Sequence, residues 1–197
     1  MYHFLNNSII LIVAPEIAAV FSFNPISAQG EIVILTCLTV GIFIDSYEWV
    51  KDHRIVGNNQ TLEVIVNATS GGIYTCTVSN AAGTDSASTT LYVEPFINTP
   101  LNDQTLTTNG SSININCDGA GFPTPNISWV NGLGLEVSNS SQLQLNPVMF
   151  GDEGLYTCVL TTEIFGMNFS AMDETTLFGN NIIINVHIFL LFNTQCT

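Results

Sequence analysis

Apolar and polar residues alternate along most of this chain with a period of two. Residues 113–118 switch strictly between apolar Ile or Cys and polar Asn or Asp. In residues 33–37, Val, Leu and Cys share one parity, and the Trp and Tyr positions downstream fall on the same pattern. Because successive side chains of a strand point to opposite faces of a sheet, this period predicts half-buried β-strands. A helical period of 3.6 is hard to find anywhere in the chain.

The chain contains a repeat with a period of about 80 residues. Trp follows the first Cys by 12 positions in both copies, and the second Cys follows the first by 39 or 41 positions. The repeated residues are Cys37, Trp49, Tyr74 and Cys76 in the first copy, and Cys117, Trp129, Tyr156 and Cys158 in the second. Gly, Pro and Asn turn signals separate the short strands, so we expect antiparallel sandwiches.

The fold class is therefore all-β, with two tandem Greek-key sandwiches. We expect a leading segment at residues 1–13 that could be a signal-peptide remnant, domains at 14–94 and 95–178, and a hydrophobic tail of unclear status at 179–197. The segment from Glu94 to Pro100 predicts a very short junction that places the domains end to end.

These motifs resemble the immunoglobulin superfamily, and within it the intermediate set. The strongest match is in the second copy, where Asp152-Glu153-Gly154-Leu155-Tyr156-Thr157-Cys158 follows Trp129. In the first copy Ser70 stands where the family usually has the aspartate, and one residue is missing before that turn. Asn80-Ala81-Ala82-Gly83 resembles the family's last hairpin, and Gly166 takes that part in the second copy.

The resemblance implies disulfides between Cys37 and Cys76 and between Cys117 and Cys158. On sequence alone four cysteines allow three connectivities. It also implies that Trp49 and Trp129 pack against these bridges, and that the hydroxyls of Tyr74 and Tyr156 bond back to a strand corner. These residues are interpreted as core and not as ligand contacts. The fifth cysteine, Cys196, is interpreted as part of a ragged terminus, with pairing to another chain as the alternative.

Charge narrows the possible partners. Sixteen acidic residues face two basic ones, for a net charge of −14. Two cations cannot supply a nucleic-acid footprint, so no nucleic acid is expected, and anionic membrane is disfavoured for the same reason. We interpret the one mixed-charge cluster, residues 51–54, as a solvated loop, with an interaction site as the alternative.

No catalytic or metal-binding pattern emerges from the sequence. His3, His53 and His187 lie far apart, Cys-x-x-Cys is absent, and no nucleophile has a positioned base. We therefore expect no enzyme activity, no cofactor, no metal and no small-molecule substrate.

Cysteine spacing and seven Asn-x-Ser/Thr sequons favour an extracellular protein. Asn59, Asn67, Asn109 and Asn139 fall in expected loops and are the best candidates for glycosylation. The apolar run at residues 182–192 is too short for a membrane helix, so we expect no membrane anchor in this chain.

Other proteins are the expected partners, bound homophilically or heterophilically in cell adhesion or cell-surface recognition. A receptor ectodomain that binds a soluble ligand, and a spacer segment of an intracellular muscle filament protein, are the alternatives. Because fold does not fix function, this expectation follows from the resemblance.

Overall fold

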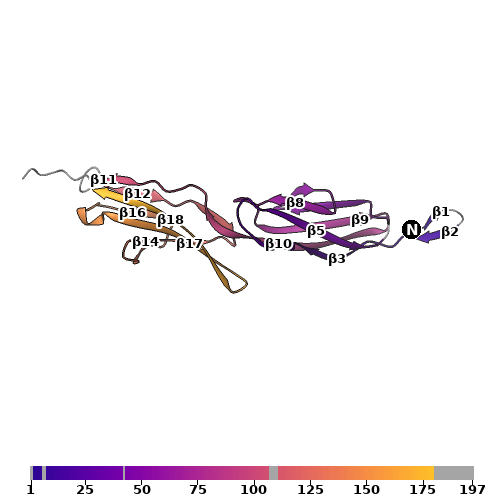
Figure 1. Ribbon diagram of the computed structural model, residues 1–197. Coiled ribbons are helices and arrows are strands. Elements are labelled where there is room, and N and C mark those ends of the chain that lie inside the picture. The colour runs from indigo at the N-terminus through magenta and orange to yellow at the C-terminus, as the bar shows by residue number, and fades with distance from the viewer. Residues whose placement is uncertain (1, 6–7, 42, 107–110, 180–197) are drawn as a thin grey trace, which may run out of the picture.

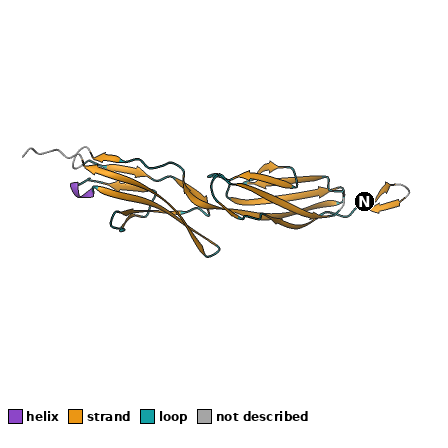
Figure 2. Cartoon of the chain, viewed as in Figure 1, coloured by secondary structure: helices purple, strands orange, loops and turns teal. Residues whose placement is uncertain are grey.

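The computed structural model describes residues 2–5, 8–41, 43–106 and 111–179. Figure 1 shows two β-sandwiches placed end to end, with the N-terminus at one end of the rod. In the described part of the chain the remaining regular element is one 3₁₀ turn, Phe150–Asp152 (Figure 2). The predicted all-β fold and the end-to-end arrangement are both observed.

The N-terminal sandwich consists of two layers, which are antiparallel except for the parallel pair of β4 with β10. One is the three-stranded sheet β3-β5-β8, and the other contains β4, β10, β9, β6 and β7. The strands are β3 (Glu16–Phe21), β4 (Ile26–Ser27), β5 (Ile32–Val40), β6 (Ser46–Lys51), β7 (Arg54–Gly57), β8 (Thr61–Ile65), β9 (Gly72–Asn80) and β10 (Gly83–Ile97). Before them, β1 (Tyr2–Leu5) and β2 (Ser8–Leu11) form a separate hairpin within the predicted leading segment.

The C-terminal sandwich also consists of two layers. One layer is β12-β16, and the other is β11-β18-β17-β14-β15. The strands are β11 (Gln104–Leu106), β12 (Ile113–Asn116), β13 (Gly119–Phe122), β14 (Asn126–Asn131), β15 (Glu136–Ser138), β16 (Gln142–Leu145), β17 (Gly154–Ile164) and β18 (Met167–Gly179).

Two-residue turns set the register of the long hairpins. Asp52 and His53, between β6 and β7, both have positive φ, as do Phe165 and Gly166 between β17 and β18. Positive φ at both central positions is the geometry of a type I′ turn, whose twist matches that of the flanking strands. Ala81-Ala82 closes the β9–β10 hairpin, so both hairpins predicted from the sequence are present.

Each sandwich has its own apolar core, built from one parity of its strands. In the N-terminal core Val33, Leu35 and Val78 are buried beside the Cys37–Cys76 pair, and in the C-terminal core Ile115, Leu143 and Leu160 surround Cys117–Cys158. The alternation read from the sequence is therefore the alternation between core and solvent.

Candidate functional site

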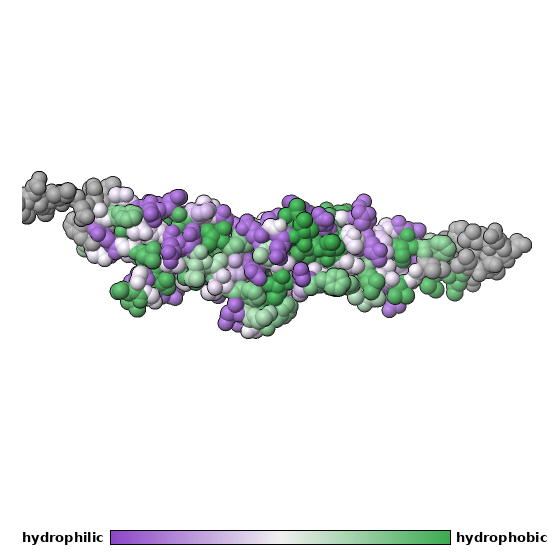
Figure 3. Space-filling model, viewed as in Figure 1, coloured by the Kyte–Doolittle hydropathy of each residue, from purple (hydrophilic) through white to green (hydrophobic). Residues whose placement is uncertain are grey.

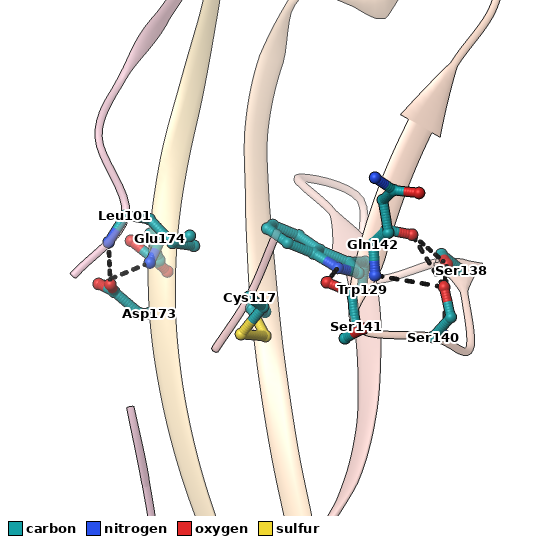
Figure 4. The surroundings of a disulfide bond; sticks show 10 residues. Leu101, Cys117, Trp129, Ser138, Ser140, Ser141, Gln142, Asp173 and Glu174 are labelled. Atoms are coloured by element: carbon teal, nitrogen blue, oxygen red, sulfur yellow. Dashed lines mark hydrogen bonds between the residues drawn. A yellow bond between two sulfur atoms is a disulfide. The ribbon is translucent and has the colours of Figure 1, made fainter. Parts of the chain in front are cut away.

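A disulfide and a tryptophan lie at the centre of each sandwich. Cys37 is bonded to Cys76, and Cys117 to Cys158, with a Cα–Cα separation of 6.3 Å in each pair. These are the pairings that the family resemblance implied. Figure 4 shows the Trp129 ring beside the bridge of Cys117.

Both tryptophans are fully buried and satisfy their indole N–H. The Nε1 of Trp49 donates to the Asn59 carbonyl at 2.9 Å, and that of Trp129 to the Ser141 carbonyl at 3.4 Å. A buried indole without such a partner would leave a polar group unpaired. These residues therefore hold the two sheets together and are not accessible to a ligand.

The tyrosine corners are also present in both copies. Tyr74 donates its hydroxyl hydrogen to the Ser70 carbonyl at 2.8 Å, and Tyr156 donates to the Asp152 carbonyl at 3.1 Å. Burial, with a smaller contribution from the charge of Asp52, raises the pKa of Tyr74 to about 12. Burial and then Asp152 likewise raise the pKa of Tyr156.

Ser70 takes over the task of the missing aspartate. The Asn67 N–H donates to Ser70 Oγ, just as the Met149 N–H donates to Asp152 Oδ2 three residues before the second corner. Ser70 Oγ in turn donates to the Asn67 carbonyl at 2.9 Å. A hydroxyl both accepts and donates, so the corner keeps its shape without the carboxylate.

An equivalent aspartate contact occurs in each domain and was missed by the sequence analysis. Asp85 on β10 accepts from the Ile17 N–H at 2.7 Å, and Asp173 on β18 accepts from the Leu101 N–H at 2.6 Å (Figure 4). Each carboxylate also caps the N–H of the next residue on its own strand. The two aspartates lie at different distances along the sequence from the preceding cysteines, Cys76 and Cys158. The repeat spacing therefore did not reveal that they are equivalent.

The predicted glycosylation residues lie where the sequence analysis expected them, in so far as they are described. Asn59, Asn67 and Asn139 are exposed in loops. The Asn67 side chain accepts from the Thr69 N–H and hydroxyl. Asn109 lies outside the described residues. Glycan occupancy at these positions stays a prediction.

One strand continues from the N-terminal sandwich into the junction. β10 runs to Ile97, and β13 of the C-terminal domain pairs with its end, so that Val93 faces Phe122 and Ile97 faces Gly119. The segment that the sequence marks as a short linker is thus hydrogen-bonded strand over most of its length.

Aromatic side chains of the C-terminal domain contact the N-terminal domain at this junction. Phe122 packs against the N-terminal core, and a Cβ added at Gly71 would lie 2.2 Å from the Phe122 Cβ, so only glycine leaves room. Phe165, at the tip of the β17–β18 hairpin, meets Tyr92 with ring centroids 4.7 Å apart. The domains therefore contact each other through side chains as well as through the shared strand.

The mixed-charge cluster borders a shallow pocket next to this junction. Lys51, Asp52 and His53 line it together with Phe122. Lys51 pairs with Asp52, and this hydrogen bond and charge lower the pKa of Asp52. Because the Asp52 side chain is exposed to solvent, this pair contributes little to stability.

In the described part of the chain, no three His, Cys, Asp or Glu residues are grouped as metal ligands. The same residues include no helix long and apolar enough to cross a bilayer.

Two models of the immunoglobulin domain match the chain, one over residues 14–93 and one over residues 94–161. The chain belongs to the immunoglobulin superfamily. Its assignment to the intermediate set stays a prediction. The two matches meet between Val93 and Glu94, inside β10, whereas the sequence analysis divides the chain between Glu94 and Pro95.

Curated relatives in this family are much longer than the chain. Human hemicentin-1 is 30% identical over 183 residues, which is 80% of this chain and 3% of hemicentin-1. The neural cell adhesion molecule L1 of Takifugu rubripes is 26% identical over 152 residues, 66% of this chain and 12% of that protein. Adhesion is thus a named role among the relatives of this immunoglobulin protein.

Solved tandem immunoglobulin domains share the fold. The N-terminal four domains of Dscam1 isoform 7.44 match with a TM-score of 0.57 at 19% identity, covering 86% of this chain and 46% of that one. The titin tandem A164-A165 matches with a TM-score of 0.54 at 21% identity, covering 86% of this chain and all of that one.

Proposed function

We propose that this chain is an extracellular protein-binding module that acts in cell adhesion or cell-surface recognition by binding and not by catalysis. The observation that carries the proposal is the rod itself. Two disulfide-bonded sandwiches are fixed end to end by a shared strand and by the Phe122 contact. Such a rod presents sheet faces and loop tips to other proteins at a defined spacing.

The disulfides support the extracellular location. Both bridges lie in fully buried cores, and disulfides persist in oxidising compartments. Sequons on exposed loops at Asn59, Asn67 and Asn139 are accessible to glycosylation there. Relatives named as adhesion molecules point the same way.

Expression as a secreted protein tests the location. Intact mass is measured with and without glycan removal, and after alkylation with and without reduction. We expect glycan mass and four thiols that react only after reduction. Free thiols at Cys37, Cys76, Cys117 and Cys158 and no glycan on a folded protein would contradict the proposal and favour the intracellular filament spacer.

A bead assay tests the adhesive function. Beads coated at high density with the secreted chain are mixed with fluorescent beads of the same kind and with cultured cells. We expect the chain to attach beads to cells, or beads to one another, and free chain to compete. Beads coated with reduced, alkylated chain are the control. No attachment above that control to any of a panel of cell types would count against adhesion.

A further inference from the structure

The outer face of the β3-β5-β8 sheet is unusually apolar. On β5 and β8 the inward parity fills the core, while the outward parity carries five large aliphatic side chains that are 46% to 61% exposed. They are Ile32, Ile34, Leu38, Val40 and Ile65. Figure 3 shows hydrophobic side chains gathered on the surface of the N-terminal sandwich near the junction. We call these five residues the β5 face.

The strand register places the β5 face in one row along β5, interrupted by the half-buried Thr36, which lies opposite Phe21 on β3. Ile32 lies opposite Ile65, and Leu38 lies opposite the small side chain of Ala19. Single exposed apolar residues are ordinary, but a contiguous exposed apolar patch on a soluble protein marks an interaction site.

Folding does not require an apolar outer face here. At the matching position in the C-terminal sandwich, β12 and β16 expose Asn114, Asn116 and Gln144 while burying Ile115 and Leu143. The two sheets share the same interior pattern and differ on the outside. The β5 face is therefore a property of one domain and not of the fold.

Acidic residues border the β5 face. Glu63 lies opposite Ile34 and Glu16 lies opposite Val40, both exposed. The chain's two basic residues, Lys51 and Arg54, belong to the β6–β7 hairpin of the other sheet, so neither carboxylate has a Lys or Arg partner. An apolar centre with an uncompensated acidic rim is complementary to an apolar centre with a basic rim.

We infer that the β5 face docks a partner protein whose contact surface has aliphatic residues at its centre and Lys or Arg at its rim. This inference rests on the proposed function and names the surface and the partner chemistry for it. A second copy of the chain fits less well, because it brings Glu16 and Glu63 to the same rim and a further charge of −14. Side chains make the contact, since both neighbours of β5 already take its backbone hydrogen bonds.

A designed peptide tests the chemistry without knowledge of the natural partner. The probe is a fluorescent amphipathic helix with Leu on one face and Lys on the other, and a Leu/Glu helix is its matched control. Fluorescence anisotropy should show binding of the Leu/Lys peptide to the secreted chain. Ile34→Gln with Ile65→Gln should weaken it by about tenfold or more, because two buried aliphatic contacts are lost.

Matched variants locate the binding. Asn114→Ala with Gln144→Ala changes the corresponding face of the C-terminal sandwich and should leave the affinity unchanged. Glu16→Gln with Glu63→Gln should weaken binding and reduce its dependence on salt. All changed side chains are exposed, so circular dichroism should show every variant folded. Equal affinity of the peptide for the wild type and for the Ile34/Ile65 variant would overturn the inference, since the net charge of the chain alone would then explain the binding.

Self-association is measured separately by sedimentation equilibrium. We expect a monomer at micromolar concentration. A dimer that disappears in the Ile34/Ile65 variant would assign the β5 face to a second copy and overturn the inference.

A glycan placed on the face separates this inference from the proposed function. Ile34→Asn creates an Asn-Leu-Thr sequon at the centre of the β5 face, and Asn116→Thr creates an Asn-Ile-Thr sequon on the corresponding C-terminal face. With occupancy checked by mass, Ile34→Asn should abolish bead attachment and Asn116→Thr should preserve it. Attachment that survives a glycan at position 34 would overturn the inference while leaving adhesion intact, whereas no attachment by the wild type would contradict the proposed function itself.

Discussion

The N-terminal and C-terminal sandwiches bury the same kinds of residue and expose different ones. Both bury a disulfide and a tryptophan, and both close a corner with a tyrosine hydroxyl. Outside, β5 presents isoleucine, leucine and valine where β12 presents asparagine. Close packing restricts the inward parity to residues of suitable size, whereas the outward parity is restricted only by solubility and by partners. The differences between the domains therefore carry more functional information than their similarities.

Removing each disulfide is the strongest test of the shared interior. Cys37→Ala with Cys76→Ala, or Cys117→Ala with Cys158→Ala, should destabilise the affected domain by about 2–5 kcal/mol. The two losses should be similar, because the bridges close loops of 39 and 41 residues. Each domain holds one tryptophan, so guanidinium unfolding followed by fluorescence reports both transitions. A large loss in one domain and none in the other would break the equivalence.

High pH should distinguish the two corners. The pKa of Tyr74 is raised to about 12, so the folded N-terminal domain favours the neutral hydroxyl. Its contribution is complete below the ordinary pKa of about 10 and is lost as the pH rises towards 12, with a magnitude on the order of 2 kcal/mol. Tyr74→Phe should flatten this dependence when unfolding is measured at pH 9 and pH 11. The pKa of Tyr156 is also raised, so Tyr156→Phe should act on the C-terminal transition and leave the N-terminal slope unchanged. An unchanged slope in Tyr74→Phe would assign the pH dependence to other groups.

The different corner residues should contribute unequally to stability. Asp152→Ala removes a charged acceptor from the Met149 N–H and should cost about 2 kcal/mol. Ser70→Ala removes a neutral hydroxyl from the Asn67 N–H and should cost about 1 kcal/mol. Urea unfolding of the single variants measures both. A larger loss for Ser70→Ala would mean that its burial matters more than the charge of Asp152.

The smallest expected effect concerns the junction. Phe165→Ala removes the ring contact with Tyr92, which is worth about 0.5–1.5 kcal/mol. We expect little change within either domain and a broader range of interdomain angles in small-angle X-ray scattering. Leu133→Ala, at an exposed turn of the same domain, is the control. Identical scattering from the two variants would show that the shared strand and Phe122 suffice.

Much of the fold could be predicted because every second residue of a half-buried strand points into the core. The spacing of Cys37, Trp49 and Cys76 places all three on inward positions, and the second copy repeats it. The β5 face could also have been predicted from the sequence. Residues 32–35 are all apolar, so if Val33 and Leu35 point inward, Ile32 and Ile34 must point outward. The sequence analysis followed only the inward parity and missed it.

Other parts of the site could not be read from the chain. That Ser70 replaces an aspartate depends on a hydroxyl reaching a backbone N–H three residues earlier. Asp85 and Asp173 accept from backbone N–H groups about 70 positions away along the sequence, and no local pattern encodes such a contact.

The all-β class, the two copies of the repeat and the acidic charge follow from the sequence alone, because periodicity, spacing and composition are local properties. The disulfide partners followed from the family resemblance. The way in which the two domains join depends on tertiary contacts. Pro95 and Pro100 mark a linker in the sequence, yet β10 continues to Ile97 because β13 pairs with it and Phe122 fills the space above Gly71. Contacts between residues distant in sequence depend on three-dimensional packing, which no single segment of the sequence determines.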